Sequence, residues 1–76
     1  MDAYDISKNY FNKRIKITLN NNVIKYGVII KQNREGNTTI SWKFVSNNNA
    51  NEYQKTGDDK LTEIILQNDI QEIEHQ

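Results

Sequence analysis

The sequence contains no cysteine, no proline and only one histidine, His75, next to the last residue. Without cysteine the chain forms no disulfide, and one histidine alone cannot supply the ligands of a structural zinc site. A domain of 76 residues must therefore fold on its hydrophobic core alone. A chain this short also leaves little room for a catalytic cleft with supporting residues, so we expect a binding module without enzymatic activity.

Long hydrophobic runs are missing as well, and we expect no targeting signal. The longest uninterrupted apolar runs are Val28–Ile30 and Ile64–Leu66, far shorter than the roughly 18–20 residues that a membrane-spanning helix needs. The first residues, Met1–Asp5, have neither a basic nor an apolar region, so we expect no secretory signal. The sequence thus predicts no membrane partner, and a cytoplasmic location is the default expectation.

Motifs that hold metals or phosphates are also lacking. The three glycines are isolated from one another, so no glycine-rich phosphate-binding loop is present. Asp58, Asp59 and Glu63 do not match the ligand spacing of a calcium loop, and we interpret them as a solvated acidic turn. His75 has no convincing catalytic partner and lies at a chain end. We expect no catalytic residue, no metal and no cofactor.

The N-terminal residues predict a short helix over about residues 3–11. Asp2 can cap its first turn, with Asp5 three residues on in capping-box position. Ala3, Ile6 and Tyr10 follow at helical spacing, so they share one face. We expect this face to pack on the rest of the domain.

Beyond the helix the apolar residues repeat with a period of two, which is typical of half-buried strands. Asparagine-rich segments at residues 20–22 and 33–37 separate the first three strands, and asparagine favours tight turns. The last of the five predicted strands, residues 70–73, could instead form a single 3₁₀ turn. The predicted strands cover about residues 13–19, 23–32, 38–44, 61–66 and 70–73.

The second and third predicted strands supply most of the expected core. Gly27 interrupts the second strand, which favours a bulge or sharp bend that lets one strand serve both halves of a barrel. Its more apolar face holds Ile24, Tyr26, Val28 and Ile30, which we expect to point inward. On the third strand we expect Ile40, Trp42 and Phe44 to pack in the core, the alternative being an exposed stacking platform.

Residues 46–60 form the longest expected loop, although residues 52–56 could extend a hairpin. Tyr53 is its only large apolar side chain, so we expect it to be exposed and to contact a partner. Five short strands with tight turns predict a mainly β fold: one domain, residues 1–76, built as a small, strongly bent, antiparallel SH3-like barrel after a short N-terminal helix.

The pattern of residues 13–73 resembles the Sm/LSm group of small SH3-like barrels. In that family the glycine of a strand is followed six positions later by an acidic residue and ten positions later by an asparagine. In this chain the residues six and ten positions after Gly27 are Asn33 and Asn37, and Ile40 lies in the next strand. The resemblance implies RNA contact by Asn37. The family's Arg-Gly pair before the last strand is not matched, because residues 66–70 read Leu-Gln-Asn-Asp-Ile.

Charge is unevenly distributed along the chain. Residues 1–45 carry eight basic and three acidic side chains, a net +5, while residues 46–76 carry two basic and seven acidic ones, a net −5. The basic positions alternate with apolar ones, so they could form a patch that binds RNA or single-stranded nucleic acid. The alternative is that these basic residues are simply the solvent-exposed polar side of the strands. The basic residues expected at a nucleic-acid site are Arg14, Lys16, Lys31, Arg34 and Lys43.

Two functions remain open from the sequence. The first is nucleic-acid binding through the basic strand face. The second is protein interaction or assembly, in which strand edges pair with a host protein, or with copies of the chain so that the basic half of one copy meets the acidic half of the next in a homo-oligomeric ring.

Overall fold

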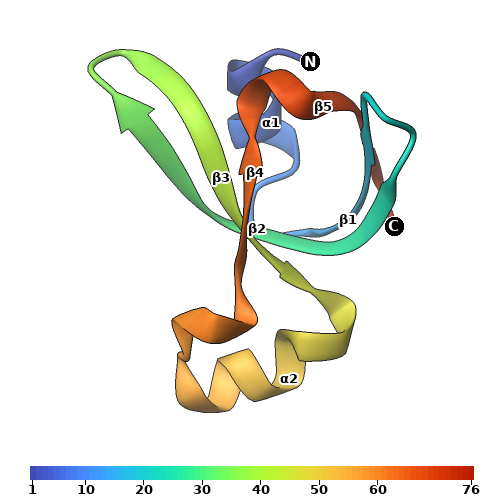
Figure 1. The fold of residues 1–76 in the computed structure, drawn as a ribbon, viewed down its shortest axis with the longest axis vertical. Coiled ribbons are helices and arrows are strands. Elements are labelled where there is room, and N and C mark those ends of the chain that lie inside the picture. The colour runs from blue at the N-terminus through green and yellow to red at the C-terminus, as the bar shows by residue number, and fades with distance from the viewer.

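A computed structural model describes all 76 residues, and it is mainly β (Figure 1). The predicted fold class is confirmed: five antiparallel strands form one sheet behind a short N-terminal helix. In chain order the elements are α1 (Ala3–Asn9), β1 (Arg14–Leu19), β2 (Ile24–Glu35), β3 (Thr38–Ser46), α2 (Asn47–Thr56), the 3₁₀ turn η1 (Asp59–Leu61), β4 (Glu63–Leu66), the 3₁₀ turn η2 (Gln67–Asp69) and β5 (Ile70–His75).

Helix α1 begins and packs as its sequence predicts. The Asp2 carboxylate accepts a hydrogen bond from the backbone N–H of Tyr4 at 3.2 Å, which satisfies one of the free donors at the helix start. Ile6 is completely buried, and Ala3 and Tyr10 pack against the same core. The helix therefore covers one opening of the bent sheet with the face that its spacing defines.

Strand β2 organises the sheet, whose order is β4-β3-β2-β1-β5. The first part of β2 pairs with β1 and its longer second part pairs with β3, and Gly27 belongs to both ladders, opposite Ile15 on β1 and Ser46 on β3. The expected bend at Gly27 is thus confirmed as the point where β2 passes from one half of the sheet to the other. Figure 1 shows that β2 is strongly curved along its length.

The end of β2 and the start of β3 extend away from the curled part of the sheet (Figure 1). We call this hairpin, residues 32–42, the hairpin arm. The strands pair along the arm as far as Glu35 and Thr38, so the turn is tighter than the five residues that the sequence predicted. Gly36 occupies the turn with a φ of +62°, a left-handed conformation that glycine adopts without steric cost. Most of the predicted turn is therefore strand.

The core fills the concave side of the sheet. Trp42 and Phe44 are fully buried, which confirms their predicted role. The prediction for β2 was wrong: Ile24 and Tyr26 are nearly half-exposed, and Ile40 on β3 is exposed as well. The other buried apolar residues of the core cluster are Ile6, Ile15, Ile17, Ile29, Ile65, Ile70 and Ile73.

The register explains why β2 presents the opposite face to the core. Ile17 of β1 is buried and lies directly across from Lys25, while buried Ile15 lies across from Gly27. Residues opposite one another in an antiparallel pair point to the same side of the sheet. The inward positions of β2 are therefore Lys25, Gly27 and Ile29, and the strand's more apolar set points outward.

The expected loop over residues 46–60 is mostly helix. Helix α2 ends at Gly57, whose φ of +63° gives a left-handed C-cap, and the Gly57 N–H donates to the Tyr53 carbonyl at 2.8 Å. Tyr53 is therefore a helical, partly buried residue and not an isolated loop side chain.

The end of the chain contains both structures that the sequence left open. Gln67–Asp69 forms a 3₁₀ turn, and β5 then runs to His75. His75 pairs with Ile15 in the β1–β5 ladder, and its ring lies 4.6 Å from the ring of Tyr10, centroid to centroid. The histidine thus belongs to the sheet, where it stacks on the residue that follows α1.

Candidate binding surfaces

The outer face of β1 and β2 combines cationic and apolar side chains. Lys16 lies directly across from Tyr26, and Arg14 lies directly across from Val28. Tyr26 has 47% of its surface exposed. The sequence placed Tyr26 in the core, so this juxtaposition of an exposed aromatic ring with two cations was not expected.

Several of the expected basic contacts are neutralised within the fold, because the antiparallel ladders place the acidic half of the chain beside the basic half. Lys16 forms an ion pair with Glu74 of β5 at 3.8 Å. Lys25 pairs with Glu63 of β4 at 2.7 Å, and Lys43 with Asp59 at 3.2 Å. The opposite charges that the sequence separates are interleaved in space, which weakens the case for one continuous basic patch.

The structure does not bring the predicted nucleic-acid residues together. Arg14 and Lys16 lie on the outer face of β1, and Lys31 lies across from Lys43 in the β2–β3 ladder. Arg34 and Asn37 belong to the hairpin arm, close to its tip. The six residues therefore occupy three separate regions of the surface: outer β1, the middle of the β2–β3 ladder and the hairpin arm.

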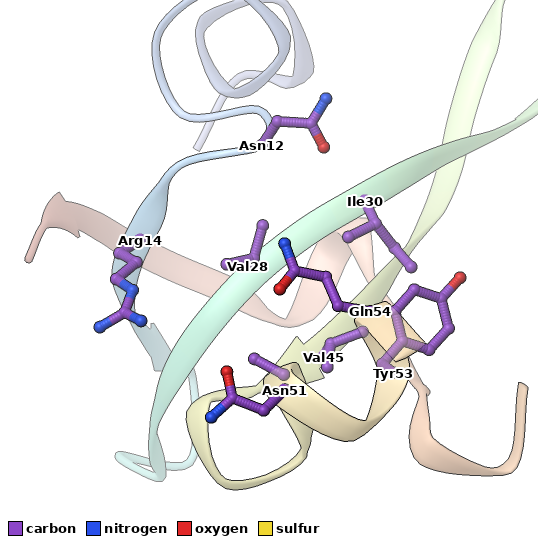
Figure 2. Close-up of a pocket in the computed structure, with 9 residues that line it drawn as sticks. Asn12, Arg14, Val28, Ile30, Val45, Asn51, Tyr53 and Gln54 are labelled. Atoms are coloured by element: carbon purple, nitrogen blue, oxygen red, sulfur yellow. The ribbon is translucent and has the colours of Figure 1, made fainter. Parts of the chain in front are cut away.

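A groove of about 400 Å³ lies between α2 and the outer face of the sheet. Figure 2 shows three aliphatic side chains, Val28, Ile30 and Val45, between Arg14 on β1 and Tyr53 on α2. The sequence missed this groove because it required α2. The other residues that line it are Asn12, Ala50, Asn51 and Gln54.

A second, polar cleft separates the hairpin arm from the start of α1. Arg34 and Asn37 line one side of it, and exposed Tyr4 lines the other. Arg34 forms no ion pair, so its guanidinium is free to bind an anion. This cleft is where two of the predicted contact residues do lie together. Its other lining residues include Gln32, Thr38, Thr39, Gln67 and Asn68.

The two edge strands of the sheet differ in character. Strand β4 pairs only with β3, and β5 pairs only with β1, so each has one backbone edge without a strand partner in the chain. On β4, Ile64 and Leu66 are 56% and 50% exposed, although both are aliphatic. On β5 the exposed side chains include the acidic Glu72 and Glu74. An exposed aliphatic edge is a ready template for pairing with another strand.

The carboxylates of the acidic turn, Asp58, Asp59 and Glu63, all make contacts within the fold. Asp58 accepts a hydrogen bond from the Lys60 N–H at 3.0 Å and caps η1, while Asp59 and Glu63 form the ion pairs with Lys43 and Lys25. No three His, Cys, Asp or Glu side chains are grouped so that they could hold a metal ion. Neither α1 nor α2 has the length and apolar composition of a membrane-crossing helix.

No family model, curated protein or solved structure matches this chain.

Proposed function

We propose that the protein is a non-enzymatic interaction module that assembles through the edge strands of its sheet. The observation that carries this proposal is the exposed aliphatic pair Ile64 and Leu66 on β4, next to a backbone edge that no strand of the chain covers. Proteins that remain monomeric protect such edges with charges, bulges or proline. Strand β4 has no proline, and its only charged residue, Glu63, is committed to Lys25.

The other edge has the chemistry that would complement β4. In the outer rows of the sheet Ile64 lies beside Lys43, and Lys43 lies beside Lys31. Strand β5 carries Glu72 and Glu74. Pairing β4 of one copy with β5 of the next would cover both backbone edges and bring the carboxylates towards the lysines. This head-to-tail contact repeats, and it closes into a ring if the rotation between copies allows it.

Native mass spectrometry of the purified chain tests this assembly. We expect a defined oligomer, and we expect the double variant Ile64→Glu, Leu66→Glu to be monomeric, because two carboxylates replace the aliphatic contact and repel Glu72 and Glu74 of the next copy. Ile40→Glu is the control, since Ile40 is also exposed but lies on an inner strand. A monomeric wild-type chain at all concentrations would contradict the proposal.

A second candidate function is binding of RNA or single-stranded nucleic acid in the polar cleft beside the hairpin arm. The observation that favours it is the unpaired Arg34 on the same cleft as Asn37 and the exposed ring of Tyr4. A free guanidinium suits a phosphate, amides suit base edges, and an exposed ring suits stacking.

Fluorescence anisotropy with short RNA and DNA oligomers tests the cleft. We expect binding that weakens steeply as salt is raised, and a further loss in Arg34→Glu. Lys60→Glu makes the same charge change at an exposed position outside the cleft and should bind as the wild type does. Flat anisotropy at low salt with every oligomer would exclude this function.

A further inference from the structure

Strand β2 carries a continuous apolar stripe on its outer face, which solvent reaches. Ile24 and Tyr26 are each 47% exposed, and Val28 and Ile30 continue the same alternation as partly buried residues. Four alternating positions of a strand span about 20 Å. Surface-exposed apolar side chains in a contiguous row, unlike scattered single ones, mark a contact site.

The stripe runs into the groove between the sheet and α2. Val28 and Ile30 belong both to the stripe and to the groove lining, and Tyr53 of α2 lies on the other side of the groove (Figure 2). Ala50 of α2 lines the groove as well. The stripe and the groove together therefore form one elongated apolar track with an aromatic side chain in each part, Tyr26 outside and Tyr53 within. Tyrosines of this kind commonly anchor protein interfaces.

The charged side chains directly next to this track on β1 are both cationic. Arg14 is the only charged residue that lines the groove, and it forms no ion pair. Lys16 lies across from Tyr26, and its only partner is Glu74 at 3.8 Å, with both side chains partly exposed. Such an exposed ion pair contributes little to stability, so a carboxylate of a partner protein can displace Glu74 from Lys16. Glu72 is farther away, on β5 across from Thr18.

We propose that this track binds an acidic, apolar peptide segment of a partner protein. Apolar side chains of the segment occupy the groove over Val28, Ile30 and Val45, and an aspartate or glutamate of the segment pairs with Arg14. A guanidinium binds a carboxylate through two parallel hydrogen bonds, which fixes the orientation of the segment. Asn12, Asn51 and Gln54 also line the groove, and their side-chain amides supply donors and acceptors for a peptide backbone. This site is separate from the β4 and β5 edges.

Two labelled peptides test the site: one alternates leucine with aspartate and the other alternates leucine with lysine. We expect the acidic peptide to bind, with amide chemical-shift changes at Val28, Ile30 and Tyr53, and the basic peptide to bind at least about tenfold more weakly. Equal binding of the two peptides, or no binding of the acidic one, would overturn the proposal. Shift changes confined to the hairpin arm or to β4 would overturn it as well.

Surface variants distinguish the contribution of the Arg14 charge to peptide affinity from the contribution of the groove's shape. Arg14→Glu should weaken acidic-peptide binding about tenfold or more, whereas Arg14→Lys should keep part of the affinity. Ala50→Leu should weaken it without any charge change, because the larger side chain fills the groove. Lys60→Glu is the control for charge, since Lys60 is exposed and lies outside the groove. Wild-type affinity in both Arg14→Glu and Ala50→Leu would refute the assignment.

The peptide experiment is independent of the assembly experiment. The double variant Ile64→Glu, Leu66→Glu should bind the acidic peptide as the wild type does, because neither residue lines the groove. Loss of the oligomer with intact peptide binding would therefore support both proposals, and an intact oligomer without peptide binding would refute the groove alone.

Discussion

Gly27 on β2 lies so close to Val45 on β3 that a Cβ atom added to it would be 2.1 Å from the Val45 carbonyl oxygen. The same atom would be 2.6 Å from the Phe44 ring and 2.9 Å from the Ser46 Cα. Two of these three neighbours are backbone atoms, which cannot move without disturbing the ladder. The bend of the sheet therefore depends on the absence of a side chain at this position.

Gly27→Ala should consequently be one of the most destabilising substitutions in the protein. We expect it to lower the free energy of unfolding by about 3 kcal/mol or more, at the upper end of what overpacking costs, because β2 and β3 must separate. Urea denaturation followed by tryptophan fluorescence measures this change through Trp42, the only tryptophan.

Gly36→Ala is the control for that measurement. Its φ of +62° makes alanine unfavourable, but no atom lies within 4 Å of an added Cβ. We expect only the backbone cost of about 1–2 kcal/mol. If Gly27→Ala were no more destabilising than Gly36→Ala, the proposed role of close approach in the bend would be incorrect.

Trp42 and Gln67 form a partly buried hydrogen bond that joins β3 to η2. The indole Nε1–H of fully buried Trp42 donates to the Gln67 side-chain oxygen at 2.6 Å. Gln67→Met should leave this donor unsatisfied and lower the free energy of unfolding by about 1–3 kcal/mol. Thermal or urea denaturation measures the loss.

A double-mutant cycle with Trp42→Phe assigns that loss to the hydrogen bond. Gln67 also donates to the Met1 carbonyl at 2.5 Å, and this contact is lost in both backgrounds, so it cancels in the cycle. Gln71→Met, at an exposed position, should change stability little. An unchanged cost of Gln67→Met in the Trp42→Phe background would show that the bond contributes nothing.

The Lys25–Glu63 ion pair, at 2.7 Å, connects the start of β2 to β4. Both side chains are about one-third exposed or more, so we expect Lys25→Met to cost only about 0.2–1 kcal/mol. The cost should fall as salt is raised, because exposed pairs are screened. Denaturation at low and high salt checks this, and the charge-swapped pair Lys25→Glu, Glu63→Lys should recover part of the stability. A salt-independent cost would point to packing of the lysine stem.

The period of two in the sequence was sufficient to locate the first four strands, and the cap residue and spacing were sufficient for α1. The fifth segment stayed open between a strand and a 3₁₀ turn, because its buried residues Ile70 and Ile73 are three positions apart. The orientation of β2 was not predictable in this way. Both of its faces carry apolar residues, and the choice between them is made by the register with β1, which places Gly27 opposite Ile15. Register is a long-range property that alternation within one strand does not contain.

Helix α2 escaped prediction for a different reason. Asparagine has a low helix propensity, and Ala50 and Tyr53 are the only apolar residues in Asn47–Thr56, so no apolar stripe was visible. The one usable signal was Gly57, which ends the helix in the left-handed conformation. Because the groove lies between α2 and the outer face of β2, both errors had to be corrected before it could be recognised.

The central claim, head-to-tail assembly through the sheet edges, is tested most directly by mixing two edge variants in native mass spectrometry. Ile64→Glu with Leu66→Glu places carboxylates on the β4 edge that repel those of β5, and Glu72→Lys with Glu74→Lys reverses the charge of the β5 edge. We predict that each variant alone is monomeric and that the mixture forms hetero-oligomers, since one intact β4 edge meets one intact β5 edge. A mixture that remains monomeric, beside a monomeric wild type, would contradict the account.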